Sequence, residues 1–101
     1  MKITKFKNFP IGNNVPQCRI SSGNGYVDFS ILSDQICAHT WHCPGEVRIF
    51  LMELEKYADY LKLKLTIPTV LNHKLRNILM ENGYSIKYVP YMDDVYELWE
   101  K

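Results

Sequence analysis

The chain has 101 residues, of which 47% are hydrophobic and 13% aromatic, and this is enough for one compact domain over residues 1–101. Its formal net charge of +1 comes from 12 basic and 11 acidic residues spread along the chain, so no broad charged surface predicts nucleic acid or an anionic membrane as a partner. We expect a cytoplasmic protein, because the number of cysteines is odd and the first residues lack the apolar run of a secretion signal. No apolar run approaches the roughly 20 residues of a membrane span.

Residues 1–25 are predicted to form an irregular N-terminal arm or short strands. Turn-forming residues are concentrated between Pro10 and Gly25, which indicates a long loop. Within this region residues 17–21 have the pattern of a short strand, and residues 21–25 (Ser-Ser-Gly-Asn-Gly) are a strong turn signal.

Two strands joined by a short turn are predicted next. The first runs from Tyr26 to Leu32, and the second from about Gln35 to His42, with Ser33 and Asp34 as a two-residue connection. Period-two geometry assigns one face of the second strand to Cys37, His39, Trp41 and Cys43. Because both faces are then partly apolar, we expect a central strand.

The most regular helical pattern follows Pro44 and Gly45. Apolar residues fall at positions 47, 50, 51, 54, 57, 58 and 61, the spacing of one helical stripe. The charged residues between them form the solvated side of the same helix. The sequence therefore predicts an amphipathic helix from Val47 to Leu61.

A strand and a second helix are predicted after it. Leu63 to Ile67 alternates apolar and polar residues, and Pro68 limits the strand. A helix is expected from Val70 or Asn72 to Glu81, with Asn72 as its N-cap and a C-terminal stop at residues 82–83 (Asn-Gly).

The chain is predicted to end in two strands, residues 84–89 and 95–99. The intervening residues 90–94 are expected to form a loop too long for the tightest hairpin. The order is then arm, strand, strand, helix, strand, helix, strand, strand. It indicates an α+β fold with a mixed, largely antiparallel sheet and two helices.

From Tyr26 onward this order resembles the conserved half of the GNAT family of N-acetyltransferases. The segment FLMELEKYADYLKLKLTI is similar to the long helix and following strand of that family, and TVLNHKLRNILMENGYSIKY to its next helix and strand. The resemblance implies a truncated GNAT fold that transfers an acetyl group from acetyl-CoA to an amine. Because the N-terminal arm is too short to supply the helices that shape the acceptor groove of that family, the resemblance favours a protein as the substrate or partner.

In that family a (Gln/Arg)-x-x-Gly-x-(Gly/Ala) motif places backbone N–H groups at the N-terminus of the long helix against the CoA pyrophosphate. Here the corresponding residues are His42-Cys43-Pro44-Gly45-Glu46-Val47, so Gly45 matches the first glycine while His42, Glu46 and Val47 depart from the pattern. The resemblance implies acetyl-CoA contacts at the following residues: Thr40, Trp41, Gly45, Glu46, Val47, Arg48 and Asn72.

The resemblance also implies a general base on the central strand, for which His39 and His42 are the candidates. The tyrosine that often protonates the departing thiolate is replaced by Leu79. This replacement, the altered glycine motif and the short arm support an alternative, a non-catalytic GNAT-like module that binds a protein, such as a phage-type inhibitor or a subunit of a complex.

Other chemistry is open at the same strand. Cys37, His39, His42 and Cys43 have zinc-ligand types but lie together only if the strand bends, so we expect no metal site. Cys43 beside His39, with Asp28 on the neighbouring strand, is a possible nucleophile arrangement, and a helix N-terminus lowers the pKa of a thiol placed there.

Two further surfaces are open to a partner. His73, Lys74 and Arg76 form a basic patch that fits a CoA phosphate or an acidic partner. The aromatic residues of the C-terminal strands fit a core, or a homodimer if they are exposed.

Overall fold

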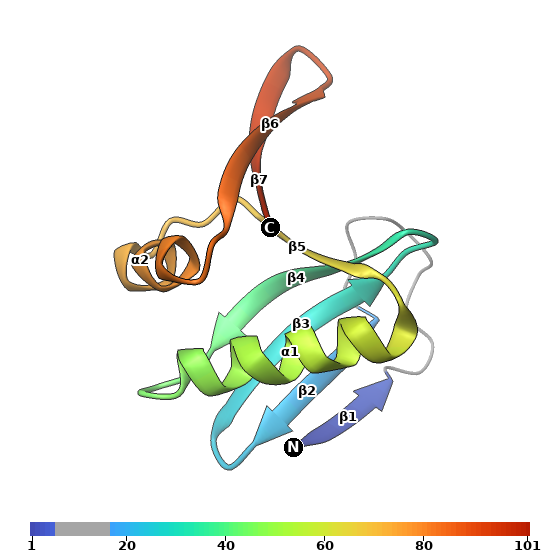
Figure 1. Cartoon of the computed structure of the whole chain (residues 1–101), viewed down its shortest axis with the longest axis vertical. Coiled ribbons are helices and arrows are strands. Elements are labelled where there is room, and N and C mark those ends of the chain that lie inside the picture. The colour runs from blue at the N-terminus through green and yellow to red at the C-terminus, as the bar shows by residue number, and fades with distance from the viewer. Residues whose placement is uncertain (6–16) are drawn as a thin grey trace.

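The computed structural model describes residues 1–5 and 17–101, and in these residues it has seven strands and two helices (Figure 1). The elements are β1 (Lys2–Lys5), β2 (Cys18–Ser22), β3 (Gly25–Ile31), β4 (Gln35–His42), α1 (Val47–Leu61), β5 (Lys64–Pro68), α2 (His73–Glu81), β6 (Ser85–Tyr91) and β7 (Asp94–Glu100). The strands form one sheet in the order β1-β2-β3-β4-β5-β7-β6. Among the described pairs β4 and β5 are parallel and the others antiparallel, which confirms the predicted α+β class with a largely antiparallel sheet.

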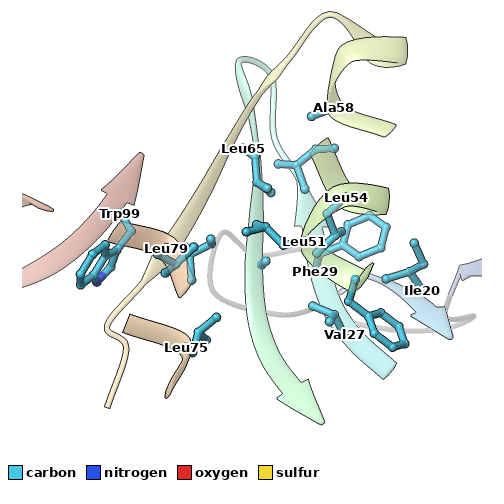
Figure 2. Packing of buried hydrophobic residues seen from close by; sticks show 14 of the residues in the cluster. Ile20, Val27, Phe29, Leu51, Leu54, Ala58, Leu65, Leu75, Leu79 and Trp99 are labelled. Carbon is cyan, nitrogen blue, oxygen red and sulfur yellow. The ribbon is translucent and has the colours of Figure 1, made fainter. Parts of the chain in front are cut away.

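Helix α1 lies across one face of the sheet and forms the core with it (Figure 1). Its bounds agree with the predicted helix, and its apolar stripe buries Phe50, Leu51, Leu54 and Ala58. These side chains pack with residues of β2 and β3, as Figure 2 shows for Ile20, Val27 and Phe29. Full burial of a side chain of this size stabilises a fold by about 1.5–3 kcal/mol.

Helix α2 begins directly after Asn72, the residue predicted to be its N-cap. Asn72 Oδ1 accepts a hydrogen bond from the backbone N–H of Leu75 at 3.0 Å, which satisfies one of the free donors of the first turn. Leu75, Ile78 and Leu79 are buried, and Gly83 follows the helix with φ +86°. Neither α1 nor α2, the helices of the described residues, has the length and hydrophobicity needed to cross a membrane.

The N-terminal region contributes strands to the sheet. Strand β2 confirms the short strand predicted at residues 17–21, and it pairs with β3. Strand β1, which pairs with β2, agrees with the alternative of short strands in residues 1–25, but its position was not predicted, because all four of its residues are exposed and no alternation of buried and exposed residues marks it. The long loop predicted from Pro10 to Gly25 falls partly on residues 6–16, which lie outside the described residues.

The β6–β7 connection differs from the prediction. Tyr91 pairs with Asp94, so the turn has the two residues Met92 and Asp93, and the expected long loop is wrong. Pro90 remains inside β6 because this strand lies at the edge of the sheet, where a missing N–H leaves no partner unpaired.

Candidate functional site

The parallel strands β4 and β5 stay paired over a short length only. Their register joins Gln35–Cys37 to Lys64–Thr66. Beyond this point Ile67 and Pro68 of β5 pair with β7, while β4 continues beside β3 to His42. The two strands therefore diverge (Figure 1), and residues of β4 line one cavity at the end of the strand and another along it.

The first cavity lies where β4 ends and both helices begin, and it has a volume of about 300 Å³. It is lined by Trp41, His42, Cys43, Pro44, Gly45, Val47, Asn72, Lys74 and Leu75. A smaller cavity of about 80 Å³ adjoins it and adds Glu46 and Arg48. The structure thus brings together every residue predicted to contact acetyl-CoA except Thr40, which is exposed and lines none of the cavities described here.

The backbone at the start of α1 is open. Gly45 has φ +73°, a conformation that other residues adopt at a cost, and a Cβ built there meets nothing within 4 Å. Glu46 occupies the N-cap, but its side chain makes no capping hydrogen bond. The N–H groups of the first turn of α1 are therefore available to an anion, and the helix dipole favours negative charge at this end.

Cations surround this helix end. Lys74 of α2 lines both the first cavity and its small neighbour. Arg48 donates to Glu81 of α2 at 3.0 Å, an exposed ion pair that joins the two helices. Of the predicted basic patch, Arg76 is engaged elsewhere, because it donates to the carbonyl of Val70 and to the carboxylate of Glu97.

A β-bulge separates His39 from the first cavity. Ala38 pairs with Phe29 and Thr40 with Asp28, so His39 is an extra residue in β4. The predicted common face of His39 and Trp41 is therefore wrong. Trp41 pairs with the buried Val27 and packs against the core, on the α1 side of the sheet.

His39 lies on the opposite face of the sheet from α1. Its Nε2 is 3.0 Å from Ser30 Oγ, in a hydrogen bond across to β3. Burial lowers the pKa of His39, and the negative charge of Asp28 opposes this shift in part. The imidazole is therefore neutral at pH 7 and able to accept a proton.

A larger cavity of about 650 Å³, which we call the β4–hairpin cavity, lies beside His39. It is lined by Leu32, Gln35, Cys37, His39, Pro68, Thr69, Tyr91, Tyr96 and Leu98. Sequence reasoning singled out Cys37 and His39 on this strand but not their grouping with the other residues, because the lining comes from separate segments that only the sheet brings together. His42, the other candidate base, lines the first cavity instead and packs against Tyr26 with ring centroids 5.3 Å apart.

The cysteines do not support the nucleophile arrangement. Cys18, Cys37 and Cys43 are free and buried. Burial, reinforced by the negative charge of Glu46, raises the pKa of Cys43 to about 11. The expected lowering by the helix terminus is therefore wrong. Among the described residues no group of His, Cys, Asp or Glu side chains is placed to hold a metal ion.

Comparisons of the chain with models of protein families, with curated proteins and with solved structures found no match. The fold and the cavities described above are therefore the observations from which a function can be argued.

Proposed function

We propose that this protein is a GNAT-like N-acetyltransferase that transfers an acetyl group from acetyl-CoA to an amine on a protein. The observation that carries the proposal is the cavity at the uncapped N-terminus of α1, to which Gly45 presents open space and Lys74 a positive charge. It lies where the parallel strands β4 and β5 diverge, at the carboxyl end of β4. Clefts outside the carboxyl ends of strands are frequent ligand sites in sheets with parallel pairs.

The residues present fit the phosphates of acetyl-CoA. Free N–H groups in the first turn of a helix bind phosphate oxygens, and the absence of a Cβ at Gly45 allows close approach. Lys74 would pair with the phosphate charge, and Arg48 of the adjoining cavity adds a second cation. The carboxylate of Glu46 opposes this binding unless it stays in solvent, where its exposed side chain is free to lie.

His39 is the proposed general base. Acetyl-CoA supplies, when bound, an acetyl thioester that an amine can attack directly. The neutral imidazole of His39 accepts the proton that the amine loses, and its hydrogen bond to Ser30 holds the ring in place. Leu79 is fully buried and carries no proton to donate, so the proton for the departing thiolate would come from solvent.

Titration with acetyl-CoA, followed by calorimetry and by thermal unfolding, tests the proposal. A ligand that binds only the folded state stabilises it by about 2.7 kcal/mol at a hundredfold excess over its dissociation constant. We expect the melting temperature to rise with acetyl-CoA concentration. No shift at about 1 mM ligand, a concentration at which even a weak specific ligand begins to bind, would remove acetyl-CoA from the proposal.

Gly45→Val is the variant that tests the binding site. It adds a side chain where the phosphates would lie, so we expect acetyl-CoA binding to be lost. Gly23→Val is the matched control, because Gly23 has φ +58° and equally open surroundings but lies in the β2–β3 turn. The two variants carry the same kind of backbone strain, and equal binding by both would contradict the assignment of Gly45.

His39→Ala tests the base. Because His39 lines a different cavity from Gly45, we expect acetyl-CoA binding to be retained. Turnover with an amine should fall by about 10²–10⁴, the usual contribution of a general base. Retained turnover would assign the base to another group, and His42→Ala is the variant to measure next.

The alternative is a non-catalytic module that binds a protein. The β6–β7 hairpin favours it, because Tyr88, Met92 and Val95 are 63%, 88% and 56% exposed. Exposed apolar side chains grouped on one projecting element are typical of interaction surfaces. A protein that shows no acetyl-CoA binding but has twice the chain mass in light scattering would support a homodimer through this hairpin.

A further inference from the structure

The β4–hairpin cavity has the size and position of a ligand site in its own right. Its volume of about 650 Å³ lies within the range of about 300–1,000 Å³ found for small-molecule sites. Gln35, Cys37 and His39 of β4 form one wall, and Tyr91, Tyr96 and Leu98 of the hairpin form the other. It lies on the face of the sheet away from α1, since Ile36 and Ala38, which alternate with the β4 wall residues, belong to the core.

Two backbone irregularities lie at this cavity. The bulge leaves His39 on the same face as Cys37 and Ser30 and shifts Trp41, two residues later, to the other face, and bulges occur preferentially next to active sites, where they redirect a side chain. Thr69 has φ +33°, an unfavourable conformation for a β-branched residue. Its N–H donates to the carbonyl of Glu97 at 2.9 Å, which holds it there. Strained backbone of this kind concentrates at binding sites.

The lining of the cavity selects against charge. None of its nine residues is charged when His39 is neutral, and burial lowers the pKa of that histidine. The nearby carboxylate of Asp28 is already paired with Arg19 at 2.7 Å. A charged ligand would lose its hydration here without gaining an opposite charge.

Aromatic and polar groups in the cavity define what suits it. The rings of Tyr91 and Tyr96 meet edge to face, with centroids 6.2 Å apart and planes at 79°, and offer an aromatic surface to a third ring. His39 bonds Ser30 through Nε2, and Gln35 Oε1 accepts from Thr66 Oγ1 at 2.8 Å. In the described part of the chain, His39 Nδ1 and the Gln35 amide nitrogen have no hydrogen-bond partner, so both can orient a ligand.

We propose that the β4–hairpin cavity binds an uncharged aromatic group that carries a hydrogen-bonding substituent. The group arrives either as a free small molecule or as an aromatic side chain of a peptide. The inference does not require acetyl-CoA binding. If the proposed acetyl transfer is correct, the same cavity holds the group that flanks the acceptor amine at His39.

Three probes of the same shape and different charge test the inference in the absence of acetyl-CoA. They are indole-3-acetamide, which is neutral, indole-3-acetate and tryptamine. We expect calorimetry to show that the amide binds at least about tenfold more tightly than either charged probe. The amide should also shift the NMR signals of His39 and Tyr96.

A capped glycine-tryptophan-glycine peptide distinguishes a peptide side chain from a free small molecule as the natural ligand. A site for peptides binds this peptide more tightly than indole-3-acetamide, and a site for small molecules binds it more weakly.

Tyr91→Ala and Tyr88→Ala form a matched pair of variants. Both tyrosines are exposed residues of β6, at 51% and 63%, so neither substitution removes core packing. Of the two, only Tyr91 lines the cavity. Tyr91→Ala should therefore lower the affinity for indole-3-acetamide by about tenfold, and Tyr88→Ala should leave that affinity unchanged. Equal effects of the two substitutions, equal binding of a charged probe, or no binding at about 5 mM amide would each overturn the inference. Because acetyl-CoA is absent from these measurements, their failure is distinct from a failure of acetyl-CoA to bind, which the separate titration measures.

Discussion

Arg76 of α2 and Glu97 of β7 form an ion pair with Nη1 2.9 Å from Oε1. The same guanidinium donates to the carbonyl of Val70 at 2.8 Å and lies over the ring of Trp99, 5.0 Å from its centroid. One side chain thus joins the second helix, the loop before it and the last strand. The side chains of Arg76 and Glu97 are 28% and 25% exposed, which limits screening of the ion pair by water.

We expect Arg76→Ala to lower the free energy of unfolding by about 1–3 kcal/mol, because it leaves Glu97 and the Val70 carbonyl without their partner. For a domain of this size each kcal/mol lowers the melting temperature by about 4–8 °C. Arg48→Ala is the control, since its pair with Glu81 is 63% and 57% exposed and should contribute less than about 1 kcal/mol. Urea unfolding measures both variants, and an equal loss would contradict the structural role of Arg76.

Gly25 lies against the ring of the buried Phe50. A Cβ at Gly25 would be 2.9 Å from Phe50 Cε2, which is too close for a real contact. Gly25→Ala should therefore destabilise the protein by about 1–3 kcal/mol through overpacking. Phe50→Leu makes space, so the double variant should be more stable than the sum of the two single effects by at least about 0.5 kcal/mol. Strict additivity in urea unfolding would show that the two residues do not meet.

His39 should titrate below the ordinary value of about 6.5 for histidine. Because burial lowers its pKa in the folded protein, the neutral form contributes stability above pH 6.5. That contribution is lost as the pH falls through the unfolded value toward the folded one. Titration of the ring by NMR measures the midpoint directly. Asp28→Asn should lower the pKa of His39 further, since the negative charge of Asp28 opposes the lowering caused by burial. A midpoint at or above 6.5 would contradict the burial of His39.

Cys43 should react slowly with iodoacetamide at pH 8. Its pKa is raised from 9.0 to about 11, so the thiol is protonated at that pH, and its side chain is buried. Mass spectrometry should show much faster alkylation in concentrated urea than in the folded state. The neutral thiol stabilises the fold below pH 9, and this contribution is lost as the pH rises toward 11. Rapid alkylation of the folded protein would restore the nucleophile hypothesis.

The sequence by itself determined the features that depend on neighbouring residues. The stripe from Val47 to Leu61 predicted α1, because a helix repeats its contacts every three or four residues. Asn72 predicted the start of α2, because an N-cap side chain accepts a hydrogen bond from a backbone N–H only three residues further along the chain. The order of elements from β2 to β7 and the largely antiparallel sheet followed from these local signals. The GNAT-like function remains a proposal.

The tertiary structure alone decided how the candidate residues are grouped. The bulge at His39 depends on the register between β3 and β4, so no alternation along one strand predicts it. It assigns His39 and Trp41 to opposite faces of the sheet and to different cavities. Burial, another property of the whole fold, raised the pKa of Cys43, although its position beside a helix N-terminus predicts the reverse. Local periodicity therefore specified the elements, while register and burial, which involve residues far apart in the chain, specified the chemistry.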